Sequence, residues 1–129
     1  MRKSQEGDGR GEGELDRTDS TWPVPPVSQE PVTVLLRWRV VEIAGVVRLL
    51  GWNRTGGEGR LSSKLVGIDP NARGGLTQSG RIYVLEGPSG FDADAEWVLE
   101  RWLRRHDVPM AEVRDVTNEV EAFLGKVLP

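Results

Sequence analysis

Residues 32–43 read VTVLLRWRVVEI, and this run decides the fold class. β-branched and aromatic residues dominate it, and apolar and charged side chains alternate around Trp38, which is typical of a strand with one buried face. Because successive side chains of a strand point to opposite faces, we predict two unlike faces. One face carries Leu36, Trp38 and Val40, and the opposite face carries Arg37 and Arg39.

Ala44-Gly45 follows this strand and predicts a hairpin whose second strand is residues 46–52. A two-residue turn needs a positive φ at its first central position, which alanine adopts poorly. A three-residue loop that ends in Gly45 as a left-handed bulge fits better. Both registers stay open at this point.

Further strands are predicted downstream, separated by segments rich in turn-forming residues. The third strand covers residues 61–69, and residues 76–78 and 81–87 form a final hairpin around Ser79-Gly80. The glycine-rich residues 53–60 are expected to be a mobile loop. Alternation along the third strand places Leu61, Ser63, Leu65 and Gly67 on one face and Ser62, Lys64, Val66 and Ile68 on the other.

After residue 90 the apolar period changes from two to about 3.6, which predicts a helix over residues 92–106. Its apolar stripe comprises Ala95, Val98, Leu99, Trp102 and Leu103. Acidic side chains in the first turns and arginines in the last turn suit the helix dipole. A second helix is expected to begin at Thr117 or Asn118, with Asn118 and Glu121 at capping-box spacing. For residues 109–116, helix and loop both stay open.

Strands followed by helices predict an α+β fold. We expect an antiparallel β-sheet or partly closed barrel of four to five strands, followed by two helices packed on one face. Residues 32–129 then form a single compact domain. Residues 1–20 are predicted to be a disordered acidic, glycine-rich tail, and residues 21–31 an extended proline-rich linker that docks partly through Trp22.

No motif indicates catalysis or ligand binding. Cysteine is absent and His106 is the only histidine, so no Cys- or His-based metal site and no catalytic triad is indicated. Asp92, Asp94 and Glu96 lack the spacing of a calcium loop and suit the start of a helix. Gly87-Pro-Ser-Gly90 lacks the lysine of a phosphate loop. We therefore predict no catalytic residue, no cofactor and no metal, and a protein that is not an enzyme.

The charge of the chain, −3 in total, is polarised along the sequence. Residues 32–90 hold eight basic and four acidic groups, whereas residues 91–129 hold five basic and nine acidic groups. The two halves can neutralise one another by packing together, or the basic half can face a partner. A candidate partner-binding surface on the basic half comprises Arg37, Arg39, Arg48, Trp52, Arg54 and Arg60. We expect Arg37 and Arg39 to be exposed or to pair with acids of the C-terminal helices.

These features favour a non-enzymatic protein-binding module, such as a small regulator, inhibitor or accessory subunit, whose partner is another protein. The alternative is a small β-barrel that binds single-stranded nucleic acid through arginines and aromatic side chains. The acidic tail and helices oppose that alternative. No run approaches the roughly 20 apolar residues that cross a bilayer, and no signal peptide is evident. A cytoplasmic location is therefore expected, and the excess of Arg over Lys is typical of a GC-rich bacterial genome.

Overall fold

The computed structural model describes residues 24–125 of the chain. The first five elements are strands: β1 (Val32–Ile43), β2 (Val46–Asn53), β3 (Glu58–Asp69), β4 (Gly74–Thr77) and β5 (Ile82–Leu85). They are followed by helix α1 (Ala93–Arg105), a 3-10 turn (Met110–Glu112), the short strand β6 (Val113–Asp115) and helix α2 (Thr117–Gly125). The predicted α+β class, a strongly curved sheet followed by two helices, is confirmed.

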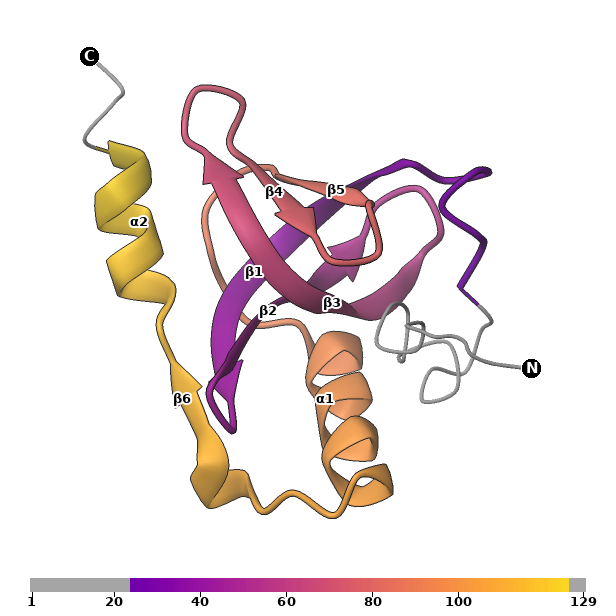
Figure 1. Ribbon diagram of the computed structural model, residues 1–129, viewed down its shortest axis with the longest axis vertical. Helices are drawn as coiled ribbons and strands as arrows, with labels where there is room; N and C mark the ends of the chain where they lie inside the picture. Colours follow the sequence, from indigo (N-terminus) through magenta and orange to yellow (C-terminus); the bar gives the residue numbers. More distant parts are fainter. Residues whose placement is uncertain (1–23, 126–129) are drawn as a thin grey trace.

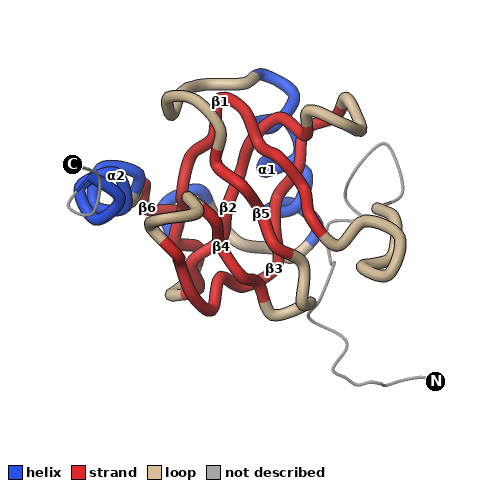
Figure 2. The backbone as a smooth tube through the Cα atoms, turned by 90° about the horizontal axis from the view of Figure 1, so that it is seen from above, coloured by secondary structure: helices blue, strands red, loops and turns tan. Residues whose placement is uncertain are grey.

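The sheet closes into an irregular ring because β1 pairs with both β2 and β5. Consecutive pairs from β1 to β5 are antiparallel, so the first and fifth strands run in the same direction and meet in parallel. Val32 lies beside Ile82, and Leu35 lies beside Leu85, across this closing contact. Figure 2 shows the strands wrapped around a common interior.

The two helices lie on different sides of the ring (Figures 1 and 2). α1 packs on β2 and β3, and α2 contacts β1. The side chain of Asp92 caps α1 by accepting a hydrogen bond from the backbone amide of Ala95 at 3.0 Å. The predicted apolar stripe of α1 is confirmed, since its five members, Trp102 among them, are all buried.

Two clusters of buried apolar side chains stabilise this arrangement. The first lies between α1 and the outer surface of β1 to β3, and it includes Val41, Leu50, Leu61 and Trp102. The second fills the ring and extends to α2. Its members are Leu35, Trp38, Val40, Leu49, Tyr83, Leu85, Val116 and Leu124. β1 is therefore buried on both faces along its second half.

The regular alternation predicted for β1 is wrong at Arg37. This residue has a φ of +47°, and the register with β2 shifts between Leu36 and Arg39. Because of this bulge, Leu35 and Trp38 are both buried although they are three positions apart. Leu36 therefore does not share a face with Trp38. A similar shift between β2 and β3 separates Leu61, which packs against α1, from Leu65, which packs against the interior cluster.

The first hairpin has the two-residue turn, and the three-residue loop favoured by the sequence is wrong. Ile43 pairs with Val46, and Ala44 and Gly45 both have positive φ, at +49° and +87°. A backbone contact supports the unfavourable alanine, because its amide donates to the carbonyl of Glu112 at 3.1 Å. The loop expected at residues 53–60 is also shorter, because β3 already begins at Glu58.

The segment whose structure stayed open, residues 109–116, supplies the 3-10 turn and then β6, which pairs with the end of β1. α2 begins at Thr117, as expected, but the predicted capping box is wrong. Asp115 accepts a hydrogen bond from the Thr117 amide at 2.8 Å, and Glu121 accepts one from Ser89 at 2.6 Å.

The predicted disordered tail, residues 1–20, and the docking of Trp22 lie outside the described residues. Residues 24–31 pack on the ring: Val24 is buried, and the carbonyl of Pro25 accepts a hydrogen bond from Arg81 at 2.5 Å. The backbone between Pro26 and Glu30 forms a turn rather than the expected extended linker.

Candidate functional site

Arg37 and Arg39, two of the six residues predicted to face a partner, pair with acidic groups near the C-terminal helices. Arg37 is exposed and lies 2.9 Å from Asp92, the N-cap of α1. Arg39 contacts Glu96 of α1, and its Nε donates to Asp115 at 2.9 Å. The predicted pairing with acids from the other half of the chain is confirmed. These contacts link β1 to α1 and to β6.

The ion pairs of Arg39 also affect its pKa. Burial by itself lowers the pKa of Arg39, but hydrogen bonds and charge attraction from Glu96 and Asp115 raise it above its ordinary value. Burial likewise raises the pKa of Asp115, yet hydrogen bonds from Thr117 and the contact with Arg39 hold it below the ordinary range. Both groups therefore stay charged at neutral pH and their charges offset each other.

Arg48 and Arg60 do not belong to any surface, because both side chains are buried. Arg48 lies on the face of β2 that α1 covers, with its guanidinium 4.7 Å from the centroid of the Trp102 ring. Arg60 lies at one end of the ring, where it contacts Glu58 at 2.7 Å and Glu30 at 3.2 Å. In this fold neither residue can reach a partner.

Trp52 and Arg54 complete the predicted set. Trp52 is half-buried, and the Arg37 guanidinium lies 5.7 Å from the centroid of its ring. Arg54 is exposed and forms an ion pair with Glu86 at 2.5 Å. The six residues thus divide between two ion-paired edges and the interior, and they do not form one continuous surface.

A different surface stands out in the folded chain: an apolar face on the outside of the ring, over β5, β4, the start of β1 and the adjoining part of β3. It comprises Val32, Val34, Val66, Leu76, Ile82 and Val84, which we call the open face. Val32 lies beside Ile82 and Leu76 lies on the other side of Ile82, so these three form a row across three strands. They are 49%, 42% and 45% exposed in the order Val32, Ile82, Leu76.

Neither helix covers the open face. β4 and β5 lie on the side of the ring away from α1 (Figure 1), and α2 contacts β1 near its other end. Large apolar side chains left in water at adjacent positions of a sheet mark interaction sites more often than singly scattered ones do. The open face therefore has the composition of a contact surface.

One sequence signal could have revealed this face. β5 reads Ile-Tyr-Val-Leu, so its alternation has no polar side: Tyr83 and Leu85 point inward, while Ile82 and Val84 point outward. A strand that is apolar on both faces is typical of burial between two layers. Here no element of residues 24–125 forms that second layer, and only the parallel pairing with β1 shows which other side chains join the surface.

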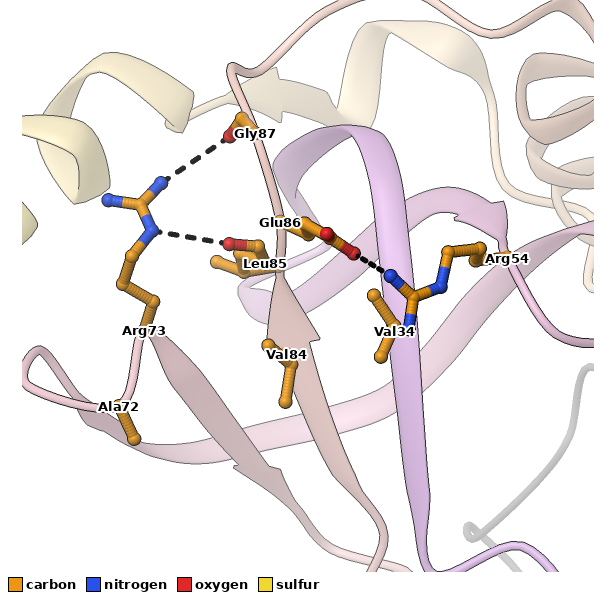
Figure 3. A pocket seen from close by; sticks show the side chains of 8 residues that line it. All are labelled: Val34, Arg54, Ala72, Arg73, Val84, Leu85, Glu86 and Gly87. Carbon is orange, nitrogen blue, oxygen red and sulfur yellow. Dashed lines mark hydrogen bonds and ion pairs between the residues drawn. The ribbon is translucent and has the colours of Figure 1, made fainter.

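A groove of about 410 Å³ adjoins the open face where β5 ends. Its lining includes Val34, Val84 and Ala72, and Figure 3 shows Arg54 and Arg73 on opposite sides of the strand with Glu86 between them. A second groove, of about 340 Å³, adjoins the same surface and is lined in part by Ile68, Leu76 and Ile82. Both volumes lie in the range of pockets that take small molecules or partner side chains.

Arg73 is held firmly at the first groove. Its Nε donates to the carbonyl of Leu85 at 3.2 Å, and its own carbonyl accepts from the Leu85 amide at 2.8 Å. The residue has a φ of +51°, a conformation that costs a non-glycine residue on the order of 1–3 kcal/mol and that recurs at functional sites. The turn before β4 is thereby fixed to the end of β5.

Comparisons with protein-family models, curated proteins and solved structures find no match to this chain. Within residues 24–125, no helix has the length and apolar character needed to span a membrane. The same residues contain no group of three or more His, Cys, Asp or Glu side chains arranged to hold a metal ion.

Proposed function

We propose that this protein is a non-enzymatic protein-binding module that acts as a small regulator, inhibitor or accessory subunit. The observation that carries the proposal is the open face, a set of apolar side chains on adjacent strands that no other part of the described chain covers. Burying such a surface against a partner is favourable by about 25 cal/mol per Å² of apolar area.

The distribution of charge supports a protein partner over single-stranded nucleic acid. Phosphate-binding surfaces depend on basic groups whose charge is not neutralised within the protein. Arg37, Arg39 and Arg54 each pair with a carboxylate, and Arg48 and Arg60 are buried. The half-buried Trp52 lies under Arg37 rather than open for base stacking.

Substitution of Leu76 by glutamate tests the proposal. Leu76→Glu places a charge at one end of the row formed with Ile82 and Val32, and it should abolish capture of a partner from the native host. Met110→Glu is the matched control, since Met110 is 54% exposed but lies in the 3-10 turn after α1. Both variants should keep the wild-type melting temperature.

A partner captured equally by wild type and Leu76→Glu would contradict the proposed surface. Tight, salt-sensitive binding of single-stranded oligonucleotides by the wild-type chain would instead favour the nucleic-acid alternative. Fractionation of host cells tests the cytoplasmic location that the sequence predicts.

A further inference from the structure

Resting on the proposed function, we propose that the groove between Arg54 and Arg73 binds a carboxylate side chain of the partner protein that is flanked by an aliphatic residue. The groove would then determine which segment of a partner docks on the open face. The occupant is an acidic, aliphatic segment of a protein chain.

The lining of the groove has an apolar part and a cationic part. Val34 and Val84 belong to the open face, so an aliphatic side chain that packs on them continues the same apolar contact. Arg54 and Arg73 flank these valines in Figure 3. A carboxylate next to an aliphatic side chain therefore matches the order of the two parts along the groove.

The two arginines differ in how much of their charge is already offset. One guanidinium nitrogen of Arg54 donates a hydrogen bond to Glu86, and the Arg54 side chain is 53% exposed. Within the described part of the chain, Arg73 donates only to the backbone carbonyls of Leu85 and Gly87, at 3.2 and 3.5 Å. Within residues 24–125, no carboxylate forms an ion pair with Arg73, so this groove retains a positive charge that a partner carboxylate can neutralise.

Glu86 makes the site selective for a carboxylate. Its side chain lies between the arginines (Figure 3) and already uses part of Arg54. With two arginines and Glu86 the groove carries a net charge of about +1, which one carboxylate neutralises, whereas a phosphate with about two negative charges leaves an excess negative charge beside Glu86. The groove thus has the charge of a site for one carboxylate group.

Selection of random 12-residue peptides displayed on phage, with the full chain as bait, tests this inference. Enriched peptides should carry Asp or Glu next to Leu, Ile or Val, and their binding should be lost on Leu76→Glu. Arg73→Gln and Arg54→Gln should each weaken such a peptide about tenfold. Glu86→Gln, which frees Arg54, should tighten it about threefold.

A double-mutant cycle gives the decisive measurement, because Arg73 also positions the turn before β4. The enriched peptide and its Asp→Asn or Glu→Gln version are titrated against wild type and Arg73→Gln. Neutralising the peptide should weaken binding to wild type about tenfold more than it weakens binding to Arg73→Gln, in which only the Arg54 contact remains to be lost. A merely structural role for Arg73 would weaken both peptides equally.

The failures of the two proposals are distinguishable. Peptides that depend on Leu76 but show neither acidic enrichment nor sensitivity to Arg54, Arg73 and Glu86 overturn the carboxylate site and leave the open face standing. Failure to enrich any peptide sensitive to Leu76→Glu overturns both proposals. Displacement of the peptide by single-stranded oligonucleotides, lost in Arg73→Gln, assigns the groove to nucleic acid instead.

Discussion

Within residues 24–125, positive φ angles occur at Arg37, Ala44, Arg73 and Asp107 besides several glycines. At three of these, the surrounding contacts account for the conformation. The bulge at Arg37 brings the Trp38 indole to the carbonyl of Gly87 at 3.0 Å, and Arg73 is fixed to Leu85. Ala44 donates its amide to Glu112, so the tight turn and the segment before β6 stabilise one another.

The positive φ of Ala44 predicts that glycine stabilises this turn. Glycine tolerates the φ of +49° that alanine pays about 1–2 kcal/mol to adopt. Glycine also loses about 0.4–1 kcal/mol more chain entropy on folding. Ala44→Gly should therefore raise the free energy of unfolding by roughly 0.5–1 kcal/mol in urea titrations.

Gly45→Ala is the matched control for that prediction. Its φ is +87°, and a Cβ placed there meets no atom within 4 Å, so the expected loss of about 1–2 kcal/mol comes from the backbone alone. Equal stability of Ala44→Gly and wild type would show that the Glu112 contact compensates the alanine fully.

Among the elements, the short strand β6 connects parts of the fold that lie far apart in the sequence. This strand of three residues joins the connection between the helices to the end of β1, and Asp115 at its C-terminal end contacts both Arg39 and Thr117. The short strand thereby connects α2 to the ring before the helix begins. Arg114 pairs with Glu42 and Glu119 on the exposed side, and such a charged edge discourages pairing with a further strand.

Asp115→Asn should lower stability in a pH-dependent way. The pKa of Asp115 is lower in the folded chain than its ordinary value, so the charged form stabilises the fold. That contribution is present in full above the ordinary value of about 3.9 and is lost as the pH falls through the folded pKa. The variant should be about 1 kcal/mol less stable at pH 7, and this difference should shrink as the pH falls below about 3.9.

Urea unfolding of both proteins between pH 2 and pH 7 measures this dependence. Glu119→Gln serves as the comparison, since its contact with Arg114 is exposed and 3.3 Å long, and it should change stability little. A loss in Asp115→Asn that stays constant across the pH range would contradict a role for the charge.

The sequence predicts elements better than it predicts their contacts. The span of β1 and the stripe of α1 follow from periodicity, which depends on neighbouring residues alone. The bulge at Arg37 escapes prediction because distant groups, among them Gly87, hold it in place. The open face escapes for the same reason: Val32 and Ile82 become neighbours only through the pairing that closes the ring.

The candidate partner surface illustrates the same limit. Six basic or aromatic residues look alike in the sequence, yet Arg54 is exposed while Arg60 is 1% exposed. Which arginine meets an internal acid depends on where Glu30, Glu58 and Glu86 lie in the fold. Composition could indicate that the two halves of the chain neutralise each other, and the contacts of Arg37 and Arg39 confirm this.

At the scale of the whole molecule, a buried cluster of charges holds residues 24–31 against the end of the ring. Glu30 accepts hydrogen bonds from Arg60 at 3.2 Å and from Arg81 at 2.9 Å, and it also accepts one from Thr33. Arg81 and Arg60 are 0% and 1% exposed. Glu30 therefore contacts both of these buried cations, and Glu58 contacts Arg60 as well.

Glu30→Gln should be strongly destabilising, because it removes the negative charge that both buried guanidinium groups contact. We expect the free energy of unfolding to fall by about 3 kcal/mol, measured by urea titration at pH 7. Glu42→Gln, which breaks the exposed pair with Arg114, should cost less than about 1 kcal/mol. Similar losses in the two variants would show that water reaches the cluster freely.

The parallel contact between β1 and β5 also sets an order of assembly. Val32 and Ile82 are fifty positions apart, so a growing chain can pair its first three strands long before it can complete the circle. Contacts of such long range form slowly, because the loop entropy is lost before they contribute stability. Until Leu85 has left the ribosome, the first half of β1 offers unpaired amides and carbonyls to any neighbouring nascent chain. Once the four residues of β5 pair with β1, the first half of that strand no longer presents a free edge on this side.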